Sequence, residues 1–230
     1  MRSLIKGIEE YERLSRPHLS ERFAELAHGQ SPHALFLTCS DSRVVPSLLA
    51  SAGPGELFVV RNVANQVPPS TPEAPDVGAD SSVSSAVWYA LEVLKVKDVV
   101  VCGHSGCGGV KALLSGAPPS PSLERWLAAA APLVEQWRAT EPTDDVLPPH
   151  DRLSQFVTRA QLDNLMTYSF VRERVLRGEV RLHSWWFDIS AGVMLAWSEA
   201  ARAFVPALEA LSERETQVRV LASAEHQAGL

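Results

Sequence analysis

Four short, strongly apolar runs alternate with segments of helical spacing along this chain of 230 residues. The runs are ALFLTC (34–39), LFVVRNVAN (57–65), DVVVCGH (98–104) and EVRLHSWWFDI (179–189). Runs that are apolar on both faces are typical of strands in a parallel sheet that helices cover on both sides. The pattern therefore predicts an α/β fold with a mostly parallel central sheet, and a further run at 192–197 makes it four or five strands.

The segments between these runs have the spacing of helices. In 83–94 the apolar residues recur at i, i+3, i+4, i+7 and i+8, which is typical of an amphipathic helix. Two N-terminal helices over 3–28, divided at Pro17, are expected to form an arm ahead of the sheet. Further helices are expected at 107–115, at 122–139 with a break near Pro132, and from Asp151 to Arg177.

Composition and charge narrow the class of protein. A net charge of -6 without a basic stripe argues against a nucleic-acid partner. No apolar run approaches the roughly 20 residues that a membrane span needs, and the N-terminus lacks the apolar core of a signal peptide. We therefore expect a cytoplasmic protein without a nucleic-acid or membrane partner. In that reducing compartment the three cysteines indicate thiolate chemistry or metal ligation rather than disulfides.

Two of the apolar runs end in residues that can ligate a metal. The stretch CSDSR places Cys39 at the end of the first run, and GHSGCGG places His104 and Cys107 at the end of the third. Ligands in parallel-sheet folds bind outside the carboxyl ends of the strands, so these three side chains can converge. Two thiolates and one imidazole form the ligand set of a catalytic zinc site that keeps one position open.

Each half of this set also has a simpler explanation. A lone cysteine that ends a strand is more often an inert buried thiol, and His104 beside three glycines could be a turn histidine. The stretch GHSGCGGVK could be an anion-binding turn at a helix N-terminus, although its lysine comes two residues late for a P-loop. Cys102 lies within the strand, and we expect it to be structural.

Taken together, the two stretches resemble the signature pair of the β-class carbonic anhydrases. The resemblance extends to further segments that occur in the family's order, GELFVVRNVANQVPP (55–69), AVWYALEVLKVKDVVVCGHSGCGGVKALLSG (86–116) and NLMTYSFVRERVLRGEVRLHSWWFDISAG (164–192). It covers roughly residues 20 to 192. The resemblance implies the reversible hydration of CO₂ to bicarbonate and a proton through a zinc-bound hydroxide.

The resemblance also assigns residues to this chemistry. It implies one zinc ion per subunit, held by Cys39, His104 and Cys107. It further implies that a dyad of Asp41 and Arg43 lies beside the metal and orients the hydroxide. Such a pair would explain why a carboxylate and a guanidinium follow a buried strand so closely, because each compensates the charge of the other.

Within the family, the chain resembles the plant-type, non-allosteric branch. Phe36 stands where the allosteric branch has a tryptophan, three residues before the first cysteine. The residues implied in substrate binding are Gln30, Phe58, Val63, Tyr89 and Gly108. In the family Gln30, Phe58 and Tyr89 reach the metal from the neighbouring subunit, so the resemblance implies a homodimer or a dimer-based oligomer. A single domain would then comprise a dimerisation arm (1–30), a catalytic α/β core (31–197) and a C-terminal tail (198–230).

Two positions depart from the family pattern, and two other functions remain open. Thr38 replaces a small residue and could alter packing behind the site, whereas Ser169 replaces a common proline in a change that we expect to be confined to the surface.

The same zinc site could hydrolyse COS or CS₂. Alternatively, Asp41 could be a fourth ligand that closes the site of a non-catalytic, zinc-stabilised binding protein.

Overall fold

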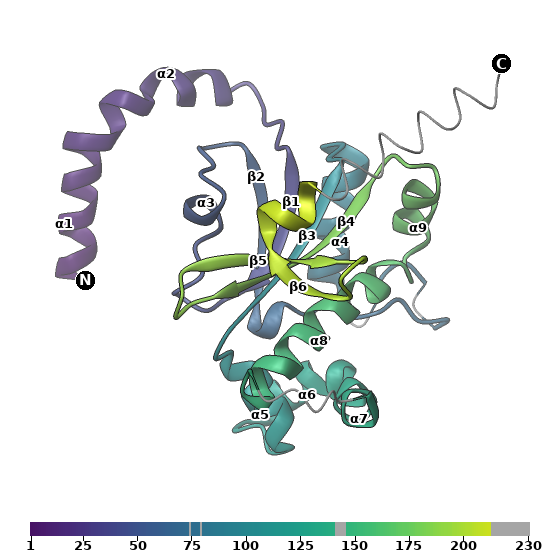
Figure 1. Cartoon of the computed structure of the whole chain (residues 1–230). Coiled ribbons are helices and arrows are strands. Elements are labelled where there is room, and N and C mark those ends of the chain that lie inside the picture. The colour runs from purple at the N-terminus through teal and green to yellow at the C-terminus, as the bar shows by residue number, and fades with distance from the viewer. Residues whose placement is uncertain (74, 79, 141–145, 213–230) are drawn as a thin grey trace.

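The computed structural model describes residues 1–73, 75–78, 80–140 and 146–212, and a single sheet lies at its centre (Figure 1). Its six described strands have the order β2-β1-β3-β4-β5-β6. They are β1 (Ala34–Cys39), β2 (Leu57–Asn62), β3 (Asp98–His104), β4 (Arg181–Asp188), β5 (Val193–Ser198) and β6 (Ala203–Pro206). The first four in the sheet are parallel, and β5 and β6 add antiparallel at one edge. The predicted mostly parallel sheet is confirmed.

The sixth strand corrects the prediction of four or five strands. β6 has only four residues, Ala203–Pro206, and it ends in a proline. Proline cannot donate a ladder hydrogen bond and is therefore confined to positions such as a sheet edge, which is where β6 lies. Residues 213–230 of the expected tail lie outside the described residues.

Helices cover both faces of the sheet because alternate strand residues point to opposite sides. On one face Leu35, Leu37 and Val101 pack against α4 (Ser81–Trp88), α8 (Pro149–Leu165) and α9 (Ser169–Leu176). On the other face Phe36 and Val100 pack near α3 (Pro46–Leu49). The remaining helices are α1 (Arg2–Glu10), α2 (Arg16–Leu26), α5 (Gly108–Ser115), α6 (Pro121–Leu127) and α7 (Ala131–Thr140).

The N-terminal arm extends away from the sheet (Figure 1). A π-helical turn at Tyr11–Ser15 joins α1 to α2, and Pro17 is the second residue of α2, which confirms the expected division. Within the described chain, α1 and α2 have no buried residue. Leu4 is 67% exposed and Ile8 is 61% exposed, so the apolar stripe that they form on α1 has no packing partner among the described residues of its own subunit.

The predicted helix from Asp151 to Arg177 is instead two helices, α8 and α9. Between them Tyr168 has an extended backbone, with φ of -77° and ψ of 127°, and its buried side chain donates its hydroxyl to the carbonyl of Pro68. Ser169 then begins α9, where its amide donates to Asp76 Oδ1 at 2.6 Å and its hydroxyl to Oδ2. The expectation that Ser169 is a mere surface change is therefore wrong, because a proline there has no amide to donate. The expected break near Pro132 is confirmed at Ala128–Ala130, ahead of α7.

In the described part of the chain, every helix is too short or too polar to cross a bilayer.

Candidate metal centre

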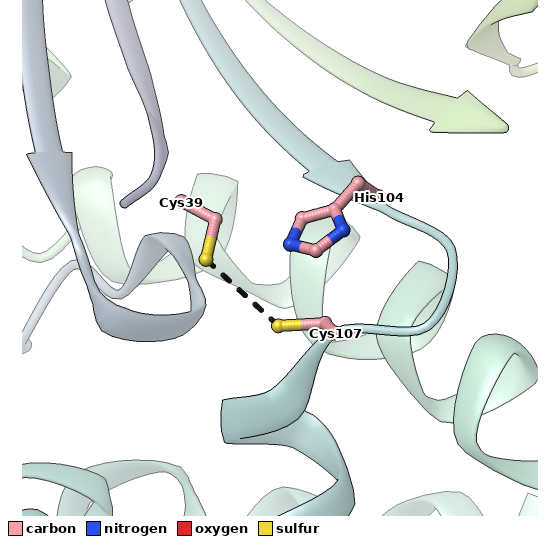
Figure 2. A group of neighbouring side chains, drawn as sticks. All are labelled: Cys39, His104 and Cys107. Atoms are coloured by element: carbon pink, nitrogen blue, oxygen red, sulfur yellow. Dashed lines mark hydrogen bonds between the residues drawn. The ribbon is translucent and has the colours of Figure 1, made fainter. Parts of the chain in front are cut away.

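Three candidate ligands meet at the carboxyl edge of the sheet. Cys39 is the last residue of β1, His104 is the last residue of the neighbouring parallel strand β3, and Cys107 caps the start of α5. Figure 2 shows their side chains gathered in one place. All three are buried, and their ligand atoms lie within 4.8 Å of one another. The predicted convergence is confirmed.

The spacing of the sulfurs suits a tetrahedral ion. The distance between Cys39 Sγ and Cys107 Sγ is 4.0 Å. Two sulfurs bound at about 2.3 Å to one tetrahedral zinc stand about 3.8 Å apart. These two side chains could therefore ligate one ion with almost no movement.

His104 is held so that one ring nitrogen faces the sulfurs. Its Nδ1–H donates to the carbonyl of Ser105 at 2.9 Å, which leaves the lone pair on Nε2. Nε2 is buried and has no hydrogen-bond partner among the described residues. A buried polar atom without a partner is costly, and a bound cation would satisfy it. The distance between the two sulfurs and the free lone pair on His104 Nε2 are therefore both those of a site that can bind a metal ion.

The protein also stabilises a thiolate at Cys39. The hydrogen bond that its sulfur shares with Cys107 Sγ, at 4.0 Å, lowers the pKa of the Cys39 thiol most strongly. Burial raises this pKa, while the nearby His104 ring and the backbone amides of Asp41 and Ala64 lower it further. At Cys102 burial is the dominant cause and raises the pKa of the thiol to about 12. The anionic sulfur needed for metal binding is thus prepared at the cluster, while Cys102 remains a neutral core residue.

Asp41 lies beside the cluster and is held by Arg43. Arg43 Nε donates to Asp41 Oδ1 at 2.9 Å, and Arg43 Nη2 donates to Oδ2 at 2.7 Å. These hydrogen bonds hold the pKa of the Asp41 carboxyl well below its usual range. Oδ2 lies 3.8 Å from His104 Nε2, so an ionised carboxylate faces the place where the three ligand atoms meet.

Comparisons with known proteins identify the family. The family model for carbonic anhydrase matches residues 34–194. A carbonic anhydrase of Pseudomonas aeruginosa is 41% identical over 214 residues, which cover 91% of this chain and 93% of the relative. The solved structure of the β-carbonic anhydrase CcaA has a TM-score of 0.79 at 32% identity and covers 90% of this chain and 91% of that chain. The chain is an enzyme of the β-class carbonic anhydrase family. Tetrameric β-carbonic anhydrases of Sordaria macrospora are also similar, with a TM-score of 0.65 at 29% identity over 85% of this chain and 92% of that chain.

In this β-class carbonic anhydrase, two expected pocket residues lie next to the metal cluster of their own chain. Val63 follows β2 at the carboxyl edge and lines a pocket of about 500 Å³ together with Ser40, Arg61 and Trp126. Gly108 follows the candidate ligand Cys107 directly, at the start of α5. The pocket opens beside the cluster because Asn62 pairs with Cys39 in the parallel register.

The other three expected pocket residues lie far from their own cluster. Phe58 and Tyr89 stack on each other with ring centroids 5.9 Å apart. Phe58 pairs with Leu35, four residues before Cys39 on β1, which corresponds to about 13 Å along a strand. Gln30 lies in the segment that leads into the opposite end of β1. Within the described chain, these side chains therefore do not reach the cluster of their own subunit.

Arg61 contacts the site, and the sequence analysis missed it. Its Nη2 donates to the carbonyl of Asp41 at 2.7 Å, and its Nε donates to the carbonyl of Cys39 at 3.2 Å. Arg61 thereby holds the backbone that carries both a candidate ligand and the dyad carboxylate. In the pairing of β1 with β2, Arg61 lies opposite Thr38, the residue before Cys39. The contact therefore depends on the register between the two strands, which no local sequence pattern shows.

The turn after β2 is also part of the site. Ala64 and Asn65 both have left-handed backbones, with φ of 62° and 46°, which turns the Ala64 amide toward the Cys39 sulfur. A side chain at Gly109 would lie 2.9 Å from Ala64 Cβ and from Val63 Cγ1. Glycine at 109 therefore lets this turn pack against α5 beside the cluster.

Thr38 does not disturb the packing behind the site. Its side chain is buried, and its hydroxyl donates to the carbonyl of Cys102 at 2.9 Å. The larger residue is accommodated because its one polar group has a partner.

Proposed function

We propose that this enzyme catalyses the reversible hydration of CO₂ to bicarbonate and a proton, with one zinc ion per subunit held by Cys39, His104 and Cys107. The observation that carries the proposal is the meeting of two thiols and one imidazole lone pair beside an Asp–Arg pair. Three protein ligands are typical of catalytic zinc, whereas structural zinc has four. Both Asp41 oxygens are engaged by Arg43, which argues against Asp41 as a closing fourth ligand.

The residues around the cluster have distinct roles in this proposal. Zinc bound there would lower the pKa of a water molecule toward neutrality and so would supply the hydroxide for the reaction. Asp41, kept ionised by Arg43, accepts a hydrogen bond from the attacking oxygen and so directs its lone pair at the CO₂ carbon.

The pocket residues bind the substrate and stabilise the developing charge. Val63, Phe58 and Tyr89 surround apolar CO₂ and exclude water, and Gly108 leaves room for it beside Cys107. The Gln30 amide donates to a CO₂ oxygen as negative charge develops on it.

The active site is completed by a second copy of the chain. Gln30, Phe58 and Tyr89 are placed far from their own cluster, and an open pocket lies beside that cluster at Val63. Both features support a homodimer or a dimer-based oligomer in which each subunit supplies these residues to its partner. The tetrameric relatives of Sordaria macrospora agree with such an assembly.

The arm gives the assembly its contact surface. Residues 1–30 expose the apolar stripe of α1, and a helix without a packing partner is only marginally stable in water. We infer that this stripe packs on the partner subunit. The catalytic core is then 31–197, with β6 of the region 198–230 added to its sheet.

Two further assignments accompany this function. Phe36, which stands where the allosteric branch has a tryptophan, is a buried core residue here. It packs edge-on against Trp185, with the ring centroids 5.9 Å apart. This supports the plant-type, non-allosteric branch. We expect the enzyme to work in the cytoplasm.

Stopped-flow measurement of CO₂ hydration, with metal analysis on the same sample, tests the proposal. We expect one zinc per chain and hydration far above the buffer rate. A hydration rate equal to that of buffer, combined with turnover of COS or CS₂, would refute CO₂ as the substrate. Purified protein that binds no zinc would refute the metal site.

A further inference from the structure

The peptide group between Ser105 and Gly106 is hydrogen-bonded at both ends. Its carbonyl accepts from His104 Nδ1 at 2.9 Å. Its N–H, which belongs to Gly106, donates to Asp151 Oδ1 at 2.6 Å. A peptide group is planar and rigid, so this single unit couples the orientation of the His104 ring to a carboxylate 45 residues away along the chain.

Asp151 is built into the protein at this point. It lies in the first turn of α8 and is 7% exposed, and His150 Nε2 is 3.6 Å from its Oδ1. One turn later, Ser154 donates its hydroxyl to the carbonyl of His104 at 3.0 Å. Ser154 in turn accepts from Trp186 Nε1 at 3.1 Å, which fixes it against β4. Two side chains of one helix therefore hold the His104–Gly106 segment.

A carboxylate at this place suits the chemistry of a metal-ligating histidine. Such histidines usually donate their second ring N–H to a carboxylate or a carbonyl, which fixes the tautomer and makes the ligating nitrogen more basic. When an anion accepts from the N–H of a peptide, it polarises the carbonyl of that peptide and strengthens it as an acceptor. Here a carbonyl and a carboxylate act in series.

We propose that Asp151 is a positioning residue that orients and polarises the metal ligand His104 through the Ser105–Gly106 peptide. This proposal rests on the proposed function, in which Cys39, His104 and Cys107 hold zinc, and it adds Asp151 as a residue that positions one of these ligands. A role confined to stabilising the turn at Gly106, whose φ is +65°, predicts changes in protein stability and in the Gly106 amide shift, with metal retention and the His104 Nδ1–H shift unchanged. The proposed role predicts a change in metal retention and in the magnetic environment of Gly106 and His104.

The test compares Asp151→Asn with Asp163→Asn in the full-length protein. The Asp151→Asn substitution keeps the size of the side chain and one acceptor oxygen but removes the charge. Asp163 lies on the same helix with its side chain 76% exposed, so its variant controls for the loss of one charge from α8. We measure zinc transfer to a chromogenic chelator and the proton shifts of the Gly106 amide and the His104 Nδ1–H.

We expect Asp151→Asn to release zinc about 10-fold faster than the wild type, with the Gly106 amide proton shifted upfield, and Asp163→Asn to change neither. Zinc release at the wild-type rate by a folded Asp151→Asn variant would overturn the proposal. In the metal-free wild type, the Gly106 amide should already be strongly downfield, and an ordinary shift there would also overturn it. Wild-type protein without affinity for zinc would instead refute the proposed function, while the metal-free shift still reports on Asp151.

Discussion

Arg43 holds the Asp41 carboxylate through two parallel side-chain hydrogen bonds, of 2.9 Å from Nε and 2.7 Å from Nη2. The oxygen that accepts the shorter bond lies 3.8 Å from Nε2 of His104, the nitrogen that faces the candidate metal site. The guanidinium therefore fixes which way this carboxylate points. If it is removed, the oxygen is close enough to move onto a bound metal.

Arg43→Ala should lose CO₂ hydration by about 100-fold, the cost of misplacing a catalytic group by about 1 Å, while it keeps its zinc. Stopped-flow rates and metal analysis check this, and X-ray absorption should show an additional carboxylate oxygen on the metal. Arg138→Ala removes an exposed arginine that also pairs with a glutamate, and it should be as active as the wild type. Full activity of Arg43→Ala would contradict the role of the dyad.

The three cysteines should differ sharply in their effect on metal content. Cys39→Ala and Cys107→Ala each remove a ligand and should lose zinc and activity together, because a site with two protein ligands binds weakly. Cys102→Ala removes a thiol whose pKa burial raises to about 12, and it should keep its zinc. Loss of zinc from Cys102→Ala alone would show that the ligand set is wrong.

Zinc removal with a chelator should also lower the melting temperature of the wild type, since the ion binds only the folded chain.

Activity should be restored when two inactive variants share a dimer. Cys39→Ala lacks a working metal cluster but has an intact Phe58, and Phe58→Ala has the reverse. Because Phe58 lies about 13 Å along the strand from its own Cys39, a mixed dimer should have one complete site. Co-expression with two affinity tags and a hydration assay of the purified mixed species checks this. A mixed dimer no more active than its parents would place the pocket within one subunit.

The arm should govern dimerisation. Replacing Leu4 and Ile8 together with glutamate should weaken the dimer by about tenfold or more, since each is expected to bury its apolar side chain on the partner. Analytical ultracentrifugation over a range of concentrations measures the effect. Glu9→Gln and Glu10→Gln alter polar residues of the same helix and should leave the dimer unchanged. An unchanged dissociation constant for the Leu4 and Ile8 variant would remove the arm from the interface.

A partly buried ion pair far from the metal should make stability depend on pH. Arg174 donates to both carboxylate oxygens of Glu92, at 2.8 and 2.7 Å, and lowers the pKa of that carboxyl. A lowered folded-state pKa contributes stability above the unfolded value of about 4.3 and loses it as the pH falls through the folded value. Glu92→Gln should therefore cost about 1 kcal/mol at pH 7, or roughly 2–4 °C in melting temperature.

The difference between Glu92→Gln and the wild type should shrink as the pH falls from about 4.3 through the lower folded-state pKa of Glu92, because the carboxyl is protonated first in the unfolded chain and then in the folded protein as well. Glu135→Gln is the matched control, since its pair with Arg138 is exposed and should contribute little. A gap that stays constant from pH 7 to acid would contradict the sign of the pKa shift.

The sequence by itself determined where β1 and β3 lie and which residues are candidate metal ligands. Apolar runs with turn signals on either side marked β1 and β3 at their observed bounds, Ala34–Cys39 and Asp98–His104. The polarity of a parallel sheet then required Cys39 and His104 to emerge at the same edge. Both inferences use information carried within a few neighbouring residues, together with a general rule about parallel strands.

Only the tertiary structure decided the contacts between distant segments. The bond of Asp151 to Gly106, the hold of Arg61 on the Cys39–Asp41 backbone and the capping of Ser169 by Asp76 join residues 45, 20 and 93 positions apart. The distance of Phe58 from its own cluster likewise follows from the strand register. Such contacts depend on the register between strands and the packing of helices on the sheet. These arise from many weak apolar contacts summed over the whole core and leave no local pattern in the sequence.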